Sequence, residues 1–239
     1  MSRFLPLLVV CLTTVPLSAA DGWIDLLAGD SLEAFQKPSP SWGYCETIGL
    51  DPTNAKKFAA KAGKGILWNG DKGKAPDLYS KAKFADIEVE LEFMIPKGAN
   101  AGIKFHGHYE IQIIDSFGKK EPLEGDDCGG IYPKATMKPS YHHLDKGIGP
   151  KVNACKAPGE WQTLAISFRA PTFDAEGKKK TNATIVRATL NGKLLHENQD
   201  ILYPTGHRFD NPEMHEAPLM IQGDHGAIAL RVFRVRSVK

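Results

Sequence analysis

Short segments in which apolar and polar residues alternate run through most of the chain. In the clearest of them, residues 87–95, apolar side chains occupy every second position and Glu88, Glu90 and Glu92 lie between them. Side chains of a β-strand point alternately to its two faces, so this segment predicts a strand with one apolar and one charged face. The three carboxylates are typical of an ordinary solvated face, because strand position alone does not make them an acid–base pair.

The same pattern recurs along the chain, with turn residues between the segments. We expect further strands, and a hairpin turn at Asn191-Gly192, in residues 103–115, 161–169, 183–190, 193–197, 219–222 and 228–235. No long amphipathic helix is predicted, and only the Ala- and Lys-rich residues 54–62 favour a short one. Many short strands separated by Gly, Pro, Asn and Asp predict an all-β sandwich or barrel.

The first twenty residues have the composition of a secretory signal peptide. Arg3 precedes an apolar run, and Ser18-Ala19-Ala20 supplies the small residues expected before a cleavage site. The run is too short to span a membrane, and no other segment approaches that length. We therefore expect a signal peptide in residues 1–20, one domain in residues 21–239, and a secreted or periplasmic protein with no membrane span.

The charge balance limits the class of partner. The formal net charge is +2, and it falls to +1 when Arg3 is removed with the leader. Such a balance argues against nucleic acid or an anionic membrane as the partner, although it is compatible with a local charged patch.

Three cysteines lie outside the leader, at positions 45, 128 and 155. Export favours a disulfide, and we expect Cys128 to pair with Cys155, which leaves Cys45 as a free thiol. Three buried thiols without a bridge are the alternative.

The segment 104–115 contains the residues best suited to chemistry. If it forms one strand, Lys104, His106, His108, Glu110 and Gln112 share a face; a bulge or turn at Gly107 would separate the two histidines. Three interpretations remain open. The face is simply solvated; or His106 and His108 help to bind a divalent metal; or the face binds sugar and moves protons, as His with Glu can near neutral pH.

A second group of ionisable residues lies between the last two predicted strands. In Gln222-Gly223-Asp224-His225-Gly226, Asp224 could orient or charge the imidazole of His225. The alternative is a turn in which Asp and Gly have a conformational role. Residues 116–160 form a long irregular segment that includes His142-His143, and we expect this segment to overhang the site.

Several short pieces, in order along the chain, resemble the 3-keto-disaccharide hydrolase family, a family first defined as a domain of unknown function. The pieces that carry the resemblance are residues 22–29, 77–80, 84–93, 100–102, 107–116, 128–133, 158–162, 191–192, 219–226 and 231–236. The chain departs from the family pattern at Ala101, where the family commonly has Ser, at His108, where Arg is frequent, and at Val232-Phe233.

The resemblance implies a single-domain concanavalin A-like jelly-roll β-sandwich that acts on oxidised sugars. Cleavage of a 3-keto-glycoside needs a base for the C2 proton, an electrophile at the C3 oxygen and an acid at the leaving oxygen. We hypothesise His108 or His225 as the base, with Glu110 and Asp224 setting its protonation state, and a metal on His106 or His108 polarising the ketone. The residues expected to bind substrate are Lys104, Gln112, Asp115, Tyr132 and Gln222.

The same fold also hosts proteins that bind sugar without cleaving it, so the alternative function is a lectin-like carbohydrate-binding domain. The two histidines beside Glu110 favour an enzyme, because a lectin has little use for titratable groups there. An ordinary endo-glucanase is disfavoured, because we find no pair of suitably flanked carboxylates on one strand.

Overall fold

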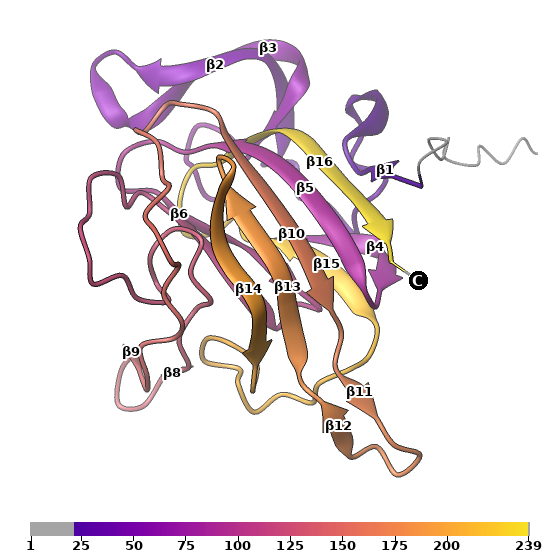
Figure 1. Ribbon diagram of the computed structural model, residues 1–239. Coiled ribbons are helices and arrows are strands. Elements are labelled where there is room, and N and C mark those ends of the chain that lie inside the picture. Colours follow the sequence, from indigo (N-terminus) through magenta and orange to yellow (C-terminus); the bar gives the residue numbers. More distant parts are fainter. Residues whose placement is uncertain (1–21, 239) are drawn as a thin grey trace, which may run out of the picture.

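The computed structural model describes residues 22–238, which form two main antiparallel sheets and two small two-stranded ones, β8-β9 and β11-β12 (Figure 1). The large sheet has the strand order β14-β13-β10-β5-β16-β3-β2, and the short β1 pairs with β16. Its strands are β1 (Ile24–Asp25), β2 (Gly43–Asp51), β3 (Asn54–Trp68), β5 (Ile87–Met94), β10 (Gln162–Arg169), β13 (Ala183–Leu190), β14 (Lys193–Ile201) and β16 (Ala229–Ser237).

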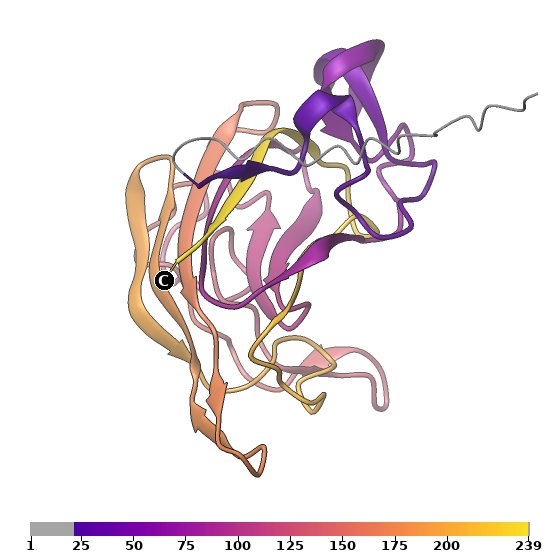
Figure 2. The same ribbon diagram turned by 90° about the vertical axis from the view of Figure 1, so that its right-hand side faces the viewer.

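The small sheet has the order β4-β15-β6-β7. Its strands are β4 (Leu78–Phe84), β6 (Asn100–Phe105), β7 (Tyr109–Ile114) and β15 (Ala217–Ile221). Short pieces lie in the connections: η1 (Ala28–Asp30), β8 (Ala135–Thr136), β9 (His142–His143), β11 (Thr172–Phe173) and β12 (Lys179–Thr181). The predicted all-β, single-domain jelly-roll sandwich is confirmed. Figure 2 shows the same two sheets from the side, with the β2–β3 hairpin rising above them.

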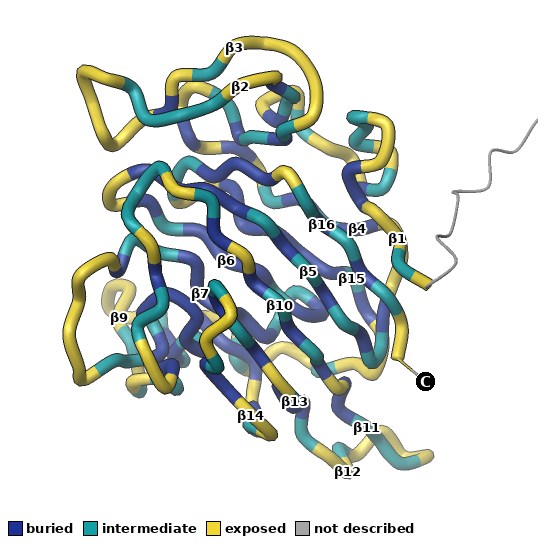
Figure 3. The backbone as a smooth tube through the Cα atoms, turned by 45° about the horizontal axis from the view of Figure 1, so that its top comes forward, coloured by how far each residue is buried: buried dark blue, intermediate teal, exposed yellow. Residues whose placement is uncertain are grey.

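The core lies between the two sheets, where their apolar faces meet. On β5 the alternation places Ile87, Val89, Leu91 and Phe93 inside, and Figure 3 shows the resulting alternation of buried and partly exposed positions along the strand. The small sheet contributes its own buried row, and Phe105 stacks on Phe168 of β10 with ring centroids 4.5 Å apart. Offset aromatic stacking of this kind joins the two layers.

The predicted strands agree with the observed ones within a few residues, but the predicted short helix at 54–62 is wrong. These residues are part of β3, which pairs with β2 in a long hairpin; Phe58, for example, lies opposite Leu50. Ala and Lys are good helix formers, but intrinsic propensity amounts to less than about 1 kcal/mol per residue, so the tertiary pairing with β2 overrides it.

The predicted Cys128–Cys155 disulfide is absent, and both residues are free thiols, like Cys45. The choice of neighbours was right, because the two buried side chains are in hydrogen-bond contact. The thiol of Cys155 also lies 3.4 Å from the carbonyl oxygen of Lys156, so the pair is satisfied without a bridge. The hydrogen bond from Cys128 lowers the pKa of Cys155.

The predicted signal peptide lies outside the described residues. Within residues 22–238, no helix is long and apolar enough to cross a membrane.

Candidate active site

The outer face of the small sheet carries a cluster of polar side chains. In the β6–β7 pairing Lys104 lies opposite Glu110 and Gly102 lies opposite Gln112. Cross-strand partners share a face, so Lys104, Glu110 and Gln112 all point away from the core. Gln222 directly follows β15, the strand next to β6, and its backbone N–H donates to the carbonyl oxygen of Gly102 at 2.9 Å.

Lys104 and Glu110 form a buried ion pair with Nζ 3.0 Å from Oε2, and only 19% and 4% of the two side chains are exposed. Burial opposes the charge on Lys104, but the Glu110 carboxylate outweighs it, so the pKa of the ammonium is raised. Burial raises the pKa of Glu110, and Lys104 opposes that shift. The site therefore holds a fixed ammonium group in a position with little water, where its field is strong.

Gly102 makes room for this pair. A Cβ atom at position 102 would lie 2.3 Å from Oε1 of Glu110, well inside contact distance. Glycine is thus required here for close approach, and any larger residue would displace the carboxylate.

A cavity of about 450 Å³ opens over this face. Its lining residues are Asn100, Lys104, Glu110, Tyr132, Met137, Tyr141, Gly206, His207, Gln222 and His225. Tyr132, Met137 and Tyr141 come from the long segment 116–160, so that segment overhangs the site as predicted. A pocket of this size, lined mainly by polar and aromatic side chains, suits a small ligand such as one or two sugar rings.

Two tyrosine hydroxyls lie on one side of the cavity. The hydroxyl oxygens of Tyr132 and Tyr141 are 2.7 Å apart, and Nε2 of His143 is 3.1 Å from that of Tyr132. Burial is the main cause of a raised pKa for Tyr132, which keeps its hydroxyl protonated and able to donate.

The loop after β15 supplies an imidazole to the cavity. Asp224 and His225 are exposed neighbours joined by a short hydrogen bond between Oδ1 and Nδ1. The backbone of the loop is held by Asp77, whose Oδ1 accepts a hydrogen bond from the amide of Gly223 at 3.0 Å. Burial raises the pKa of Asp77. The carboxylate of Asp224 fixes the orientation of the His225 ring and leaves Nε2 free.

Of the two alternatives for this segment, the turn at Gly107 is the one found. His106 therefore does not share the face of Lys104, and it does not join His108 in a metal pair on that face. β6 ends at Phe105, and the chain reverses through His106 (φ 56°) and Gly107 (φ 67°). The ring of His106 turns into the core, where Nδ1 lies 3.1 Å from the carbonyl oxygen of Met214 and the ring packs on Phe168. Among residues 22–238, no group of three or more His, Cys, Asp and Glu side chains is arranged to hold a metal ion.

Four other predicted site residues lie outside the cavity lining, and one of them is Asp224, the exposed partner of His225. His108 is half-buried at the tip of the β6–β7 hairpin, and burial lowers its pKa. Asp115 stabilises a turn, since its carboxylate accepts hydrogen bonds from the amides of Gly98 and Phe117. Gln112 is only 1% exposed and lies beneath the segment that contains Gly130, whose carbonyl oxygen accepts its backbone amide.

The sequence did not single out Asn100, Tyr141 or His207 as lining residues, or Asp77 as the support of the His225 loop. Asp77 directly precedes β4 and Asn100 begins β6, and a polar residue at such a strand end is a usable signal. His207 has no comparable signal, because it reaches the site through an irregular segment.

Glu110 is the one carboxylate among the described residues that line the cavity, and it is bound to Lys104. An ordinary glycosidase places two carboxyl groups on either side of the scissile bond. This cavity instead combines one ion pair, two imidazoles and two phenols.

Comparisons with known proteins identify the family and the fold. Residues 22–237 match the family model of the 3-keto-alpha-glucoside-1,2-lyase-like domain. A Parabacteroides distasonis crystal structure, named provisionally as a glycosyl hydrolase, is 25% identical with a TM-score of 0.67, covering 99% of this chain and 94% of that one. A second structure from the same organism, named in the same way, is 19% identical with a TM-score of 0.57, covering 90% and 99%. No curated protein matches the chain by sequence.

Proposed function

This chain belongs to the 3-keto-alpha-glucoside-1,2-lyase-like family and is a carbohydrate-active, glycosyl hydrolase-like protein, and from that premise we propose that it cleaves 3-keto-glycosides and 3-keto-disaccharides. The proposed reaction is an elimination followed by hydration. A base removes the C2 proton, which the C3 ketone acidifies, and the electron pair is held as an enolate. The enolate then expels the C1 oxygen, which leaves with a proton, and water adds across the resulting enone.

His225 is the group best placed to be the base. Of the two histidines that the sequence suggests, His225 lines the cavity and His108 does not. Its Nδ1 is hydrogen-bonded to Asp224, so Nε2 is the nitrogen that takes the proton, and the Asp224 carboxylate stabilises the imidazolium that forms.

Lys104 supplies the positive charge at the C3 oxygen. The negative charge that develops there is stabilised most by a preorganised donor in a dry site, and the buried ammonium of Lys104 is such a donor. Glu110 acts through Lys104 by fixing its position and keeping it charged. The hydroxyl pair of Tyr132 and Tyr141 is suited to donate the proton to the leaving C1 oxygen.

The observation that carries this proposal is the buried Lys104–Glu110 pair under a cavity that contains His225. A lysine-bound carboxylate is a poor nucleophile or general acid, but its partner ammonium suits an enolate. The chemistry therefore fits proton abstraction next to a ketone better than displacement through an oxocarbenium ion.

The direct test incubates the purified protein with 3-keto-trehalose and a 3-keto-glucoside and follows product release by chromatography. His225→Ala and Glu110→Gln are expected to abolish release, and His142→Ala, an exposed histidine that does not line the cavity, serves as the control. Retention of sugar without turnover would instead favour the lectin-like alternative. Residues 1–20 also support the proposal that the protein is exported and meets its substrate outside the cytoplasm.

A further inference from the structure

A second concave surface lies next to the candidate active site and is lined by lysines. This lysine groove has a volume of about 630 Å³. The ammonium groups that line it belong to Lys56, Lys57, Lys72, Lys74 and Lys97, all of which are exposed. Asp71 is the single acidic residue among its described lining residues.

The concentration of positive charge here is local. Residues 54–74 contain six lysines and one acidic residue, although the whole chain has a formal net charge of only +2. In the described part of the chain, none of the five groove lysines forms an ion pair, whereas Lys61 on the same hairpin pairs with Glu46. Like charges held around one groove repel each other, so an anionic ligand would relieve an unfavourable interaction.

The lysine groove and the catalytic cavity share one wall, the loop 223–227. His225 lines the cavity, while Gly226 and Ala227 line the groove. In the same way Asn100 lines the cavity and its neighbour Ala99 lines the groove. A chain-like ligand can therefore occupy both surfaces by crossing this single wall.

Buried hydrogen bonds hold the groove and the wall together. The side-chain amide of Asn69 donates to the carbonyl oxygens of Gly223 at 3.0 Å and Gly226 at 2.7 Å, and its oxygen accepts the amide of Ile228 at 3.0 Å. Asn69 immediately precedes the loop that carries Lys72 and Lys74. The backbone that carries these lysines is thus anchored to the backbone of the loop that carries His225.

We propose that the lysine groove binds the carboxylate groups of an acidic oligosaccharide whose adjoining sugar enters the catalytic cavity; the second half of this proposal rests on the proposed function. Lysine ammonium groups on flexible stems suit anions whose spacing is not fixed. Phe58 is the aromatic lining residue and is only 8% exposed, so the groove presents no open ring on which a nucleic acid base would stack.

The test is calorimetric titration with oligogalacturonate and with an uncharged maltooligosaccharide of the same length, at low and high salt. The groove variant is Lys56→Gln/Lys72→Gln/Lys97→Gln. The matched control is Lys120→Gln/Lys178→Gln/Lys193→Gln, which removes the same charge from exposed positions outside the groove. Turnover of a small, uncharged 3-keto-glucoside is measured in parallel.

We expect the unaltered protein and the control to bind oligogalacturonate in preference to the maltooligosaccharide, with an affinity that falls as salt rises. The groove variant should bind roughly tenfold more weakly or worse, since each exposed charge contact contributes modestly. Its turnover of the uncharged substrate should be unchanged. Glu110→Gln should lose turnover and keep oligogalacturonate binding, which separates failure of the groove from failure of the proposed function.

Three results would overturn the proposal. They are equal weakening in the groove variant and the control, no preference for oligogalacturonate over the uncharged chain, and binding to phosphatidylglycerol vesicles without binding to oligogalacturonate. The last would assign the groove to a lipid surface.

Discussion

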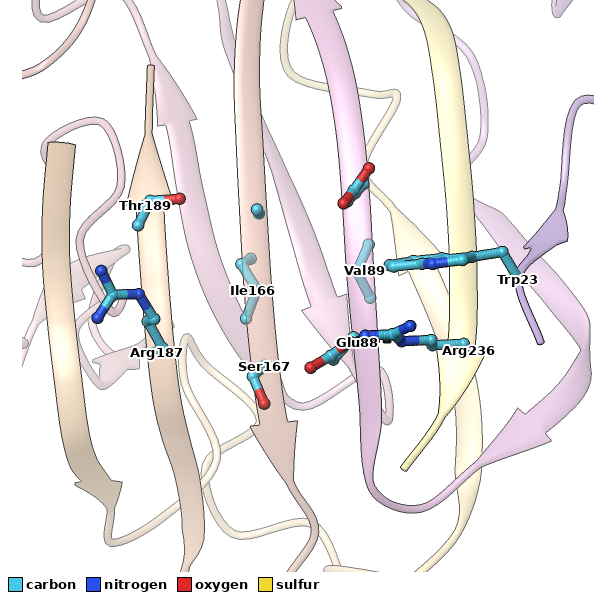
Figure 4. Close-up of a pocket in the computed structure, with 10 residues that line it drawn as sticks. Trp23, Glu88, Val89, Ile166, Ser167, Arg187, Thr189 and Arg236 are labelled. Atoms are coloured by element: carbon cyan, nitrogen blue, oxygen red, sulfur yellow. Dashed lines mark hydrogen bonds and ion pairs between the residues drawn. The ribbon is translucent and has the colours of Figure 1, made fainter. Parts of the chain in front are cut away.

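Ion pairs lie on the outer faces of both sheets, and the two faces differ mainly in whether a segment of the chain covers the pairs. On the outer face of the large sheet, Glu88, Glu90 and Glu92 of β5 pair with arginines of β16, and Figure 4 shows Glu88, Arg236 and Trp23 together on this open surface. We call these three pairs the outer row. On the outer face of the small sheet, Lys104 pairs with Glu110 beneath the long segment 116–160.

Burial, more than the distance between the two charges, determines how strongly the charges of a pair interact. Arg234 and Glu90 are 2.5 Å apart, closer than Lys104 and Glu110 at 3.0 Å, yet they are 43% and 40% exposed. Water screens such a pair, and its net contribution is small. The buried pair interacts in a poorer solvent, and removal of one partner leaves an uncompensated charge. A strong preorganised field is available only on the covered face.

The largest effect is expected from Lys104→Met. It leaves the Glu110 carboxylate buried without its partner, which should lower the free energy of unfolding by about 3–5 kcal/mol and abolish turnover. Lys104→Met/Glu110→Gln, which removes both charges, should recover part of the stability and none of the activity. Urea unfolding of both variants checks this. A loss no larger than that from an outer-row variant would mean that burial does not distinguish the two faces.

Next in size is a gain in stability on oxidation. Cys128 and Cys155 belong to the covering segment and are already in contact, so a mild oxidant should join them and stabilise the protein by about 2–4 kcal/mol. The readouts are loss of two hydrogens by mass and a raised melting temperature that reductant reverses. Cys128→Ser should show neither change. Thiols that stay free in the oxidised, folded protein would contradict the prediction.

Gly102→Ala should displace Glu110 from its position beside Lys104, because residue 102 lies on the adjacent strand of the same sheet. The added Cβ would lie 2.3 Å from Oε1 of Glu110. Overpacking of this kind costs about 1–3 kcal/mol, and the displaced carboxylate should sharply reduce turnover. Gly49→Ala, where nothing lies within 4 Å of the added atom, is the matched control. Comparable turnover in the two variants would show that the position of Glu110 is unimportant.

Two buried histidines should also make stability depend on pH. Burial lowers the pKa of His106 and of His196, whose Nε2 donates to the carbonyl oxygen of Gly129 at 2.8 Å. Below about pH 6.5 the unfolded chain binds protons that the folded one does not, so stability falls by up to about 1.4 kcal/mol per pH unit for each histidine. Denaturant unfolding between pH 7 and pH 5 should show a shallower slope for His196→Gln than for His142→Gln.

The smallest effect is expected in the outer row. Glu90→Gln and Arg234→Gln should each change the free energy of unfolding by less than about 1 kcal/mol, and turnover should not change. Arg234 also stacks on Trp23, with its guanidinium carbon 4.9 Å from the ring centroid, so its replacement should cost slightly more than that of Glu90. A larger loss from Glu90→Gln than from Gly102→Ala would reverse the ranking of the two faces.

The two faces also show where sequence reasoning succeeds. Residues 87–95 and 104–112 alternate in the same way, and period-two alternation was enough to predict both strands and their polar faces. Gly107 suggested a turn as the alternative to one long strand, but the alternation could not decide between them, since the turn at His106 requires a positive φ that a histidine seldom adopts. The error at residues 54–62 has a similar origin, because pairing with β2 is a tertiary effect.

The site could be predicted only in part, because local patterns are visible in the sequence and tertiary neighbours are not. Five predicted site residues line the cavity, and each lies either in a piece that resembles the family or in the alternating segment 104–115. They are Lys104, Glu110, Tyr132, Gln222 and His225. Asp77, Asn100 and His207 meet at the site only because the sheet order places β4, β15 and β6 side by side and because an irregular segment crosses above them. Their position at strand ends marks Asp77 and Asn100 as candidates, but no local pattern records which strands become neighbours.

The most direct test of the central claim is the fate of the C2 hydrogen. A 3-keto-glucoside carrying deuterium at C2 is incubated with the protein in ordinary water, beside no-protein and Glu110→Gln controls. If the C2 proton is removed, the released sugar will have lost its deuterium, unlabelled substrate will react faster, and the controls will release little product. Release at the same rate with deuterium retained at C2 would show that the glycosidic bond breaks without removal of the C2 proton, which would contradict the account.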